Sequence, residues 1–356
     1  MSKLFNSFIG LSTKEKTLFA KRLSFLIKSG VPIIQSLKIL QKQSSSSSRS
    51  KILDQVISDV SNGQFLSTSL AKFGHIFDQF AINLIKIGEE SGTLDANLEY
   101  LAEEMKKKHL LRRKVIGAMI YPVFIIIATL GIAGLLTVFI FPKILPIFAS
   151  LNVILPITTR ILIWVSDFLS KFGWAVGLGL VGLIIGWLLL LRLPNVRHAF
   201  EKFVFRLPLL GSISQNYHMA NFCRTLGLLL KSDIRIVRAF AIASETTSNL
   251  VYKRALQSIS GEINKGEKIT TYMEKHPRLF PHILSQMLSI GEATGRLDET
   301  LIYLSELYEN EVDEMTKNLS TVIEPALMIF MGIIVGFIAV SIITPIYEIT
   351  QHLQSK

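Results

Sequence analysis

The stretch IGEESGTLDANLEYLAEE, residues 87–104, recurs later in the chain as IGEATGRLDETLIYLSEL, residues 290–307. Ten of the twenty positions 85–104 are identical to the residues found 203 positions further on, without a gap. The same offset aligns identical residues outside this stretch: Phe19 with Phe222, Leu23 with Leu226, Gly63 with Gly266, Phe77 with Phe280, Pro122 with Pro325 and Pro142 with Pro345. Agreement at one offset over such a length indicates an internal repeat, so the chain is predicted to be a duplicated module.

The composition indicates that this module meets both water and lipid. Of the 356 residues, 49% are hydrophobic and 18% are charged, and the mean hydropathy is +0.43. The hydrophobic share is too high for an ordinary soluble enzyme, and the charged share is too high for a chain wholly in lipid. The single cysteine, Cys223, excludes an intramolecular disulfide and a cysteine-based zinc site.

Three apolar runs are each long enough, at about 20 residues, to cross roughly 30 Å of hydrocarbon as a helix. The predicted fold is therefore all-α: a polytopic membrane protein with two homologous cytoplasmic helical-bundle domains and three transmembrane helices. The chain is predicted to begin with a first domain (1–117), a span (118–141), an outer loop (142–171) and a second span (172–191). A second domain (192–321), a third span (322–344) and a short outer tail (345–356) follow.

Basic residues set the predicted orientation of the spans. Six of them lie directly before the first span, in 106–114, whereas the whole loop 142–171 has three. Four more follow the second span, in 192–206. Because Lys and Arg gather on the cytoplasmic side of membrane spans, both domains and the N-terminus are expected in the cytoplasm. The N-terminal residues lack the apolar core of a cleaved signal peptide, and the apolar segment 156–171 is expected in the outer interface.

Each domain reads as a series of helices. In the first domain, Ser12 and Glu15 form a capping box, and the helix that they begin is expected to stop at Gly30. A second helix is predicted at 32–43 and a flexible connector in the serine run 44–48. The remaining helices are predicted near 51–61, 65–73 and 77–87, followed by a long one that enters the first span from Leu94 without a break. The second domain is expected to repeat this order from about Met219 and to end in a helix at 297–319.

The repeated motif itself favours a helix hairpin. Gly92 and Gly295 suit a left-handed stop, Thr93 is a candidate N-cap, and Asp95 suits the start of the next helix. The alternative is that Glu89 and Asp95 face a partner or a cation, although the carboxylates are too few to specify a metal. The candidate interaction residues, none of them catalytic, metal-binding or cofactor-binding, are Gly88, Glu89, Gly92, Leu94, Asp95, Gly291, Glu292, Gly295, Leu297, Asp298, Pro122, Glu324 and Pro325.

With its two copies of IGE-x-x-G-x-LD, each followed by a charged helix and a span entered through Pro122 or Pro325, the chain resembles the GspF/PilC family. The resemblance covers nearly the whole chain, although many members carry a longer N-terminal extension. It implies an inner-membrane platform protein of a bacterial type IV pilus or type II secretion machine. The implied partners are a hexameric assembly ATPase, pilin or pseudopilin subunits, other inner-membrane assembly proteins and the lipid bilayer.

Glu324, next to Pro325 at the start of the third span, has two interpretations. An ionisable residue at the start of a span is often functional, here in helix packing or in pilin engagement. The alternative is that Glu324 lies at the membrane interface, where an exposed carboxylate costs little free energy and needs no function. The sequence also leaves open a type IV, secretion or competence pilus, and a homodimer or a monomer.

Other classes of protein fit less well. The segment 261–268 resembles a phosphate-binding loop but has Glu267 where the lysine is required, and no hydrolase or metalloprotease motif is present. We therefore expect no enzyme and no cofactor. A transporter would have its repeats mainly in the membrane. Much of the positive charge behind the net charge of +11 is explained by the flanks of the spans, and no zinc-finger or RNP-type motif is present, so no nucleic acid is expected.

Overall fold

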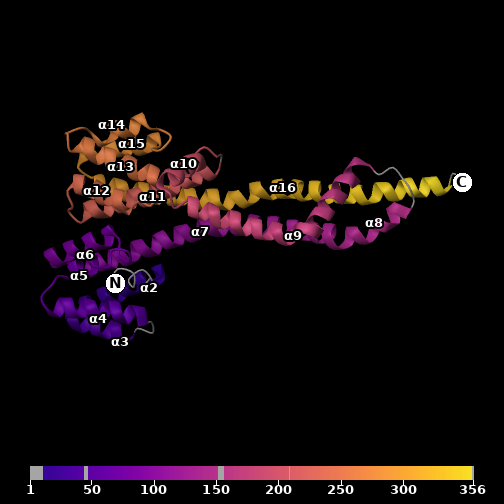
Figure 1. Ribbon diagram of the computed structural model, residues 1–356. Coiled ribbons are helices and arrows are strands. Elements are labelled where there is room, and N and C mark those ends of the chain that lie inside the picture. The colour runs from indigo at the N-terminus through magenta and orange to yellow at the C-terminus, as the bar shows by residue number, and fades with distance from the viewer. Residues whose placement is uncertain (1–10, 44–46, 151–155, 208, 355–356) are drawn as a thin grey trace. The chain divides into compact units, whose positions relative to one another are not determined.

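The computed structural model describes residues 11–43, 47–150, 156–207 and 209–354, and these residues form helices joined by turns, with no strand among them (Figure 1). Two compact units result. The first contains Met1–Lys114 and His198–Asp313, and the second contains Val115–Arg197 and Glu314–Lys356. The all-α prediction is confirmed.

The first repeat is a bundle of short helices that ends in a long one. Its helices are α2 (Thr13–Lys28), α3 (Ile33–Lys42), α4 (Ser47–Ser61), α5 (Leu66–Ala71), α6 (Gln79–Ser91) and α7 (Leu94–Leu135). The capping box of Ser12 and Glu15 is present, and Gly30 follows α2 with a φ of 83°. The prediction that residues 44–48 form a flexible connector is partly wrong, because Ser47 already begins α4. Residues 44–46 lie outside the described residues.

The second repeat has the same helices in the same order. They are α11 (Leu210–Lys231), α12 (Ile236–Thr246), α13 (Leu250–Ile263), α14 (Ile269–Lys275), α15 (His282–Thr294) and α16 (Leu297–Gln354), preceded by α10 (Pro194–Val204). The helices α12 to α16 each begin 203 residues after α3 to α7. The start of α11 differs from the prediction, since this helix begins at Leu210 rather than near Met219.

Each repeat buries one apolar core. In the first, Leu23, Leu37 and Leu66 are fully buried, and in the second Leu226 and Phe240 are. Burying a side chain of this kind contributes about 1.5–3 kcal/mol, so the helical stripes of apolar residues hold each bundle together.

The last helix of each repeat is unbroken. The helix α7 runs through Pro122, and α16 runs through Pro325 and Pro345. The prediction that the long helix enters the apolar segment without a break is confirmed for both repeats. We call α7 and α16 the stem helices.

The second unit contains the apolar parts of the stem helices with η2 (Leu136–Ile140), α8 (Phe141–Ser150) and α9 (Ile157–Leu190). Among the described residues, three helical stretches are long and apolar enough to cross a membrane: Leu94–Ile144, Ile157–Leu190 and Leu297–Pro345. Within this unit Thr159 Oγ1 donates to the Ser341 carbonyl at 2.8 Å, and Ser166 Oγ donates to the Thr137 carbonyl at 2.7 Å. Such bonds hold helices together where lipid offers no partner.

Candidate functional site

The first hairpin, between α6 and α7, turns on two glycines with different roles. Gly92 ends α6 in the left-handed conformation, with a φ of 73°. Gly88 is buried, and a Cβ at this position would lie 2.8 Å from the Leu94 Cα. Gly88 therefore permits a close approach of the two helices, while Gly92 permits the reversal of the chain.

Glu89 in this hairpin binds the neighbouring helix α5. Its carboxylate accepts hydrogen bonds from the backbone N–H groups of Leu66 and Ser67, the latter at 2.9 Å. These are N–H groups of the first turn of α5, which have no partner within the helix. The carboxylate thus has a structural role in the first repeat. Asp95 is the second residue of α7 and is half-buried, which suits the positive end of the helix dipole.

The second hairpin, between α15 and α16, keeps the backbone geometry but not this contact. Gly295 has a φ of 70°, and a Cβ on the buried Gly291 would lie 2.8 Å from Thr300 Oγ1. Glu292 is exposed, and within the described part of the chain its carboxylate has no hydrogen bond or ion pair. Leu297 and Asp298 begin α16 as Leu94 and Asp95 begin α7.

The remaining predicted site residues lie far along the stem helices. Pro122 is buried within α7, whereas Glu324 and Pro325 are exposed on α16. The structure therefore does not bring all the predicted residues to one place: they form two hairpins and two positions in the apolar segments.

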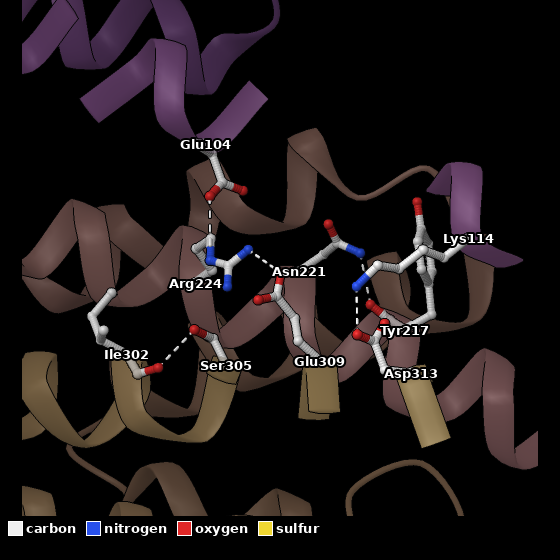
Figure 2. Close-up of polar contacts among 9 residues, drawn as sticks. All are labelled: Glu104, Lys114, Tyr217, Asn221, Arg224, Ile302, Ser305, Glu309 and Asp313. Carbon is white, nitrogen blue, oxygen red and sulfur yellow. Dashed lines mark hydrogen bonds and ion pairs between the residues drawn. The ribbon is translucent and has the colours of Figure 1, made fainter. Parts of the chain in front are cut away.

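Arg224 forms a polar cluster that the motif search did not find (Figure 2). This residue lies on α11 and is only 5% exposed. Its guanidinium donates from Nη1 to the carboxylate of Glu309 on α16, and its Nε lies 3.5 Å from Glu104 Oε2 on α7. One buried cation therefore connects the two stem helices. The available signal was that Arg224 is the only charged residue in the run 219–230.

Two carboxylates share this one guanidinium, and Glu104 is the more deeply buried. It is 4% exposed, and its Oε2 has no hydrogen-bond partner in the described parts of the chain, so the 3.5 Å ion pair is its main compensation. Burial raises the pKa of Glu104 to about 7, although the charge of Arg224 opposes the shift. Glu104 precedes the span predicted at 118–141. Near neutral pH the cluster therefore exchanges a proton, with a net charge of zero or minus one.

Further contacts continue along the same helices. Lys114 on α7 pairs with Asp313 on α16, and Lys231 on α11 lies over the Tyr100 ring at 5.4 Å from its centre. Because Tyr100 meets Lys231 and Glu104 meets Arg224, α7 and α11 run antiparallel. We call Glu104, Arg224 and Glu309, with Lys114 and Asp313, the stem junction.

A duplicated helical bundle, with two long helices that continue into apolar segments and are joined through a buried arginine, defines a polytopic helical membrane protein. The chain belongs to the family described as type II secretion system (T2SS), protein F. A sequence model of this family matches residues 19–142 and again residues 222–345. The two matches begin 203 residues apart, which confirms the internal repeat.

The chain is also similar over nearly its whole length to individual members. It is 35% identical to the type IV pilus assembly protein PilC of Thermus thermophilus, over 96% of this chain and 84% of that protein. It is 31% identical to the type IV pilus assembly protein PilC of Pseudomonas aeruginosa, over 96% of this chain and 93% of that protein. It is 30% identical to the type II secretion system protein F of Vibrio cholerae, over 98% of this chain and 85% of that protein.

These comparisons confirm the GspF/PilC family predicted from the repeated motif. The family consists of structural platform proteins and is not a known family of enzymes. The three apolar helices and the relatives together identify a membrane protein.

Proposed function

We propose that this chain is the inner-membrane platform of a type IV pilus or type II secretion machine. In this role it couples a cytoplasmic assembly ATPase to the insertion of pilin or pseudopilin subunits into a growing fibre. Its enzymatic partner supplies the energy, and the chain itself catalyses no reaction.

The observation that carries the proposal is the stem junction. Each stem helix is one unbroken helix from its hairpin to its apolar segment, and a helix transmits a push or a rotation without a slack hinge. Arg224 binds carboxylates of both stem helices, so a displacement of α11 acts on both at once. This is the arrangement that a mechanical coupling between a soluble motor and the membrane requires.

The topology belongs to the same proposal. We place the N-terminus and the domains 1–117 and 192–321 in the cytoplasm, where the ATPase is, by the distribution of basic residues. The hairpin glycines position the stem helices in these domains. Glu292, which is exposed in the second hairpin, is the proposed contact for the motor, and the exposed Glu324 is the proposed contact for pilin subunits.

A deletion strain tests the proposal. We expect loss of surface fibres or of secreted substrate, with recovery when the wild-type chain is supplied in trans. The same strains are compared for the uptake of solutes, which a transporter would change. If the deletion left fibres and secretion intact and altered solute uptake instead, the proposal would be wrong.

A further inference from the structure

The internal repeat shows which surface of the second bundle is covered by another helix. One face of α11 carries Tyr217, Asn221, Arg224, Leu228 and Lys231, spaced three or four residues apart. The stem helix α7 packs along it through the Arg224 and Lys231 contacts, and Lys108 of α7 lines one small cavity with Tyr217 and Asn221. None of these five residues except Lys231 is exposed.

The matching face of the first bundle is open. The counterparts on α2, found 203 residues earlier, are Lys14, Leu18, Lys21, Phe25 and Lys28, and all five are exposed. Phe25 is 68% exposed, an unusual state for a phenylalanine in a water-soluble bundle. A groove of about 390 Å³ lies beside this face and is lined by α2 and α7, including Lys21, Phe25 and Lys28. Within the described residues, therefore, no helix takes against the first bundle the position that the stem helix α7 takes against the second.

The helix that would fill this groove must resemble α7 in shape and match a lining of mixed charge, which has Glu99 and Glu103 beside its lysines. On α7 the contacts to α11 come from Tyr100, Glu104 and Lys108. Their counterparts on the other stem helix, α16, lie 203 residues further along the chain and are Tyr303, Leu307 and Glu311.

These α16 residues are available for a contact. Tyr303 is 57% exposed, Glu311 is exposed and Leu307 is half-buried. Tyr303 is the counterpart of Tyr100, whose ring lies under Lys231. Because Lys28 on α2 is the counterpart of Lys231, Tyr303 is expected to lie against Lys28. Glu311 replaces the basic Lys108. The cavity neighbours of Lys108, Tyr217 and Asn221, correspond to Lys14 and Leu18 on α2, so Glu311 would lie near Lys14. A tyrosine over a lysine and a carboxylate beside a lysine are both favourable pairs.

We propose that the α2–α7 groove binds the Tyr303–Leu307–Glu311 face of α16 from a second copy of this chain. The two helices α2 and α16 run antiparallel, as α11 and α7 do within one chain. In a twofold pair, each copy gives α16 to its partner's groove and receives α16 in return, so the contact is made twice. Lys28 keeps its exposed ion pair with Glu99, at 3.4 Å, beside the incoming tyrosine.

Cross-linking between two differently tagged copies tests this contact. One copy carries Lys28→Cys and the other carries Tyr303→Cys, and a short bismaleimide is added to membranes that contain both. The background is low because the single native cysteine, Cys223, is buried. We expect a product with both tags. The control replaces the first variant by Lys51→Cys, which is exposed on α4, and is expected to give at least tenfold less product.

Two results would overturn the proposal: no product with both tags, or equal yields from Lys28→Cys and Lys51→Cys. An adduct between Lys28→Cys and another protein, in place of the doubly tagged product, would likewise mean that the groove has a different occupant. The readout needs no fibre, so it can fail while the proposed platform function stands.

A charge exchange tests the expected pairing independently. Lys14→Glu in the groove copy is expected to lower the yield several-fold, because it places a carboxylate opposite Glu311, as Tyr217 lies opposite Lys108. Glu311→Lys in the other copy is expected to restore it. If the double exchange gave no more product than Lys14→Glu alone, the proposed register would be wrong. Circular dichroism of each variant checks that the helices are retained.

Discussion

Replacement of Arg224 by methionine removes the cation that Glu104 and Glu309 share and keeps a side chain of similar length. Glu104 and Glu309 then lose their shared partner while Glu104 stays 4% exposed. Breaking a buried ion pair on one side costs about 3–5 kcal/mol, because the remaining charge is left without compensation. Protonation of Glu104 relieves part of that cost at neutral pH, so we expect about 3 kcal/mol.

Hydrogen exchange of the purified chain measures this effect at the junction itself. Amides in the middle of α11 exchange when the helix opens locally, and each 1.36 kcal/mol changes the rate by a factor of ten. A loss of about 3 kcal/mol therefore predicts exchange roughly 150-fold faster in α11. The matched control is Arg254→Met on α13, where the arginine is exposed and a change within about 0.5 kcal/mol is expected.

A second substitution separates charge from packing. Adding Glu104→Gln to Arg224→Met removes one of the uncompensated carboxylates, so the double variant is expected to exchange more slowly than Arg224→Met alone. Equal exchange rates in Arg224→Met and Arg254→Met would refute the reasoning, since the buried ion pair would then contribute nothing to the local stability of α11.

Three further predictions concern Glu104 and the hairpins. The pKa of Glu104 is raised from 4.5 to about 7 in the folded chain, so between these values the folded chain binds more protons than the unfolded chain. The stability of the fold is therefore expected to fall as pH rises from about 5 to 7. Thermal unfolding measures this slope, and Glu104→Gln is expected to flatten it. Valine at Gly92 or Gly295 meets a left-handed backbone and costs at least about 1–2 kcal/mol, so each variant is expected to impair fibre assembly; normal assembly in both would count against the role of the turns. Glu89→Ala is expected to cost about 1 kcal/mol by uncapping α5, whereas Glu292→Ala stays within about 0.5 kcal/mol in the same denaturation assay.

The helices of both bundles could be predicted from the sequence because their signals are local. The capping box at Ser12, the left-handed glycines at 92 and 295, and the apolar stripes depend on residues a few positions apart. The repeat then doubled the signals of the glycines and the apolar stripes, although the capping box has no counterpart at 215 and 218. Residues 47–48 were misjudged because serine has no strong preference in the first turn of a helix, where α4 begins.

The stem junction could not be predicted in the same way. Glu104, Arg224 and Glu309 come from three helices that are distant in the sequence, and the repeat offered no guide. The counterparts of these residues in the other repeat are Leu307, Lys21 and Lys106, so the cluster breaks the internal symmetry. A lone arginine in an apolar run indicates a buried charge, but only the packing of α7 and α16 against α11 identifies its partners.

The role of Glu89 shows a related limit. Its position in the motif allowed either a partner or a structural contact, and the sequence could not rank the N–H groups of Leu66 and Ser67 among the candidates. Glu292 occupies the same motif position without that contact, so identical motifs in two repeats need not have identical uses.

The central claim, that this chain couples a motor to the membrane, is tested most directly by the response of the motor. The purified chain in lipid nanodiscs is mixed with the assembly ATPase of the same organism, and both co-elution and the rate of ATP hydrolysis are measured. The account predicts that the two proteins co-elute and that the hydrolysis rate changes when the chain is added. Separate elution together with an unchanged hydrolysis rate would contradict it.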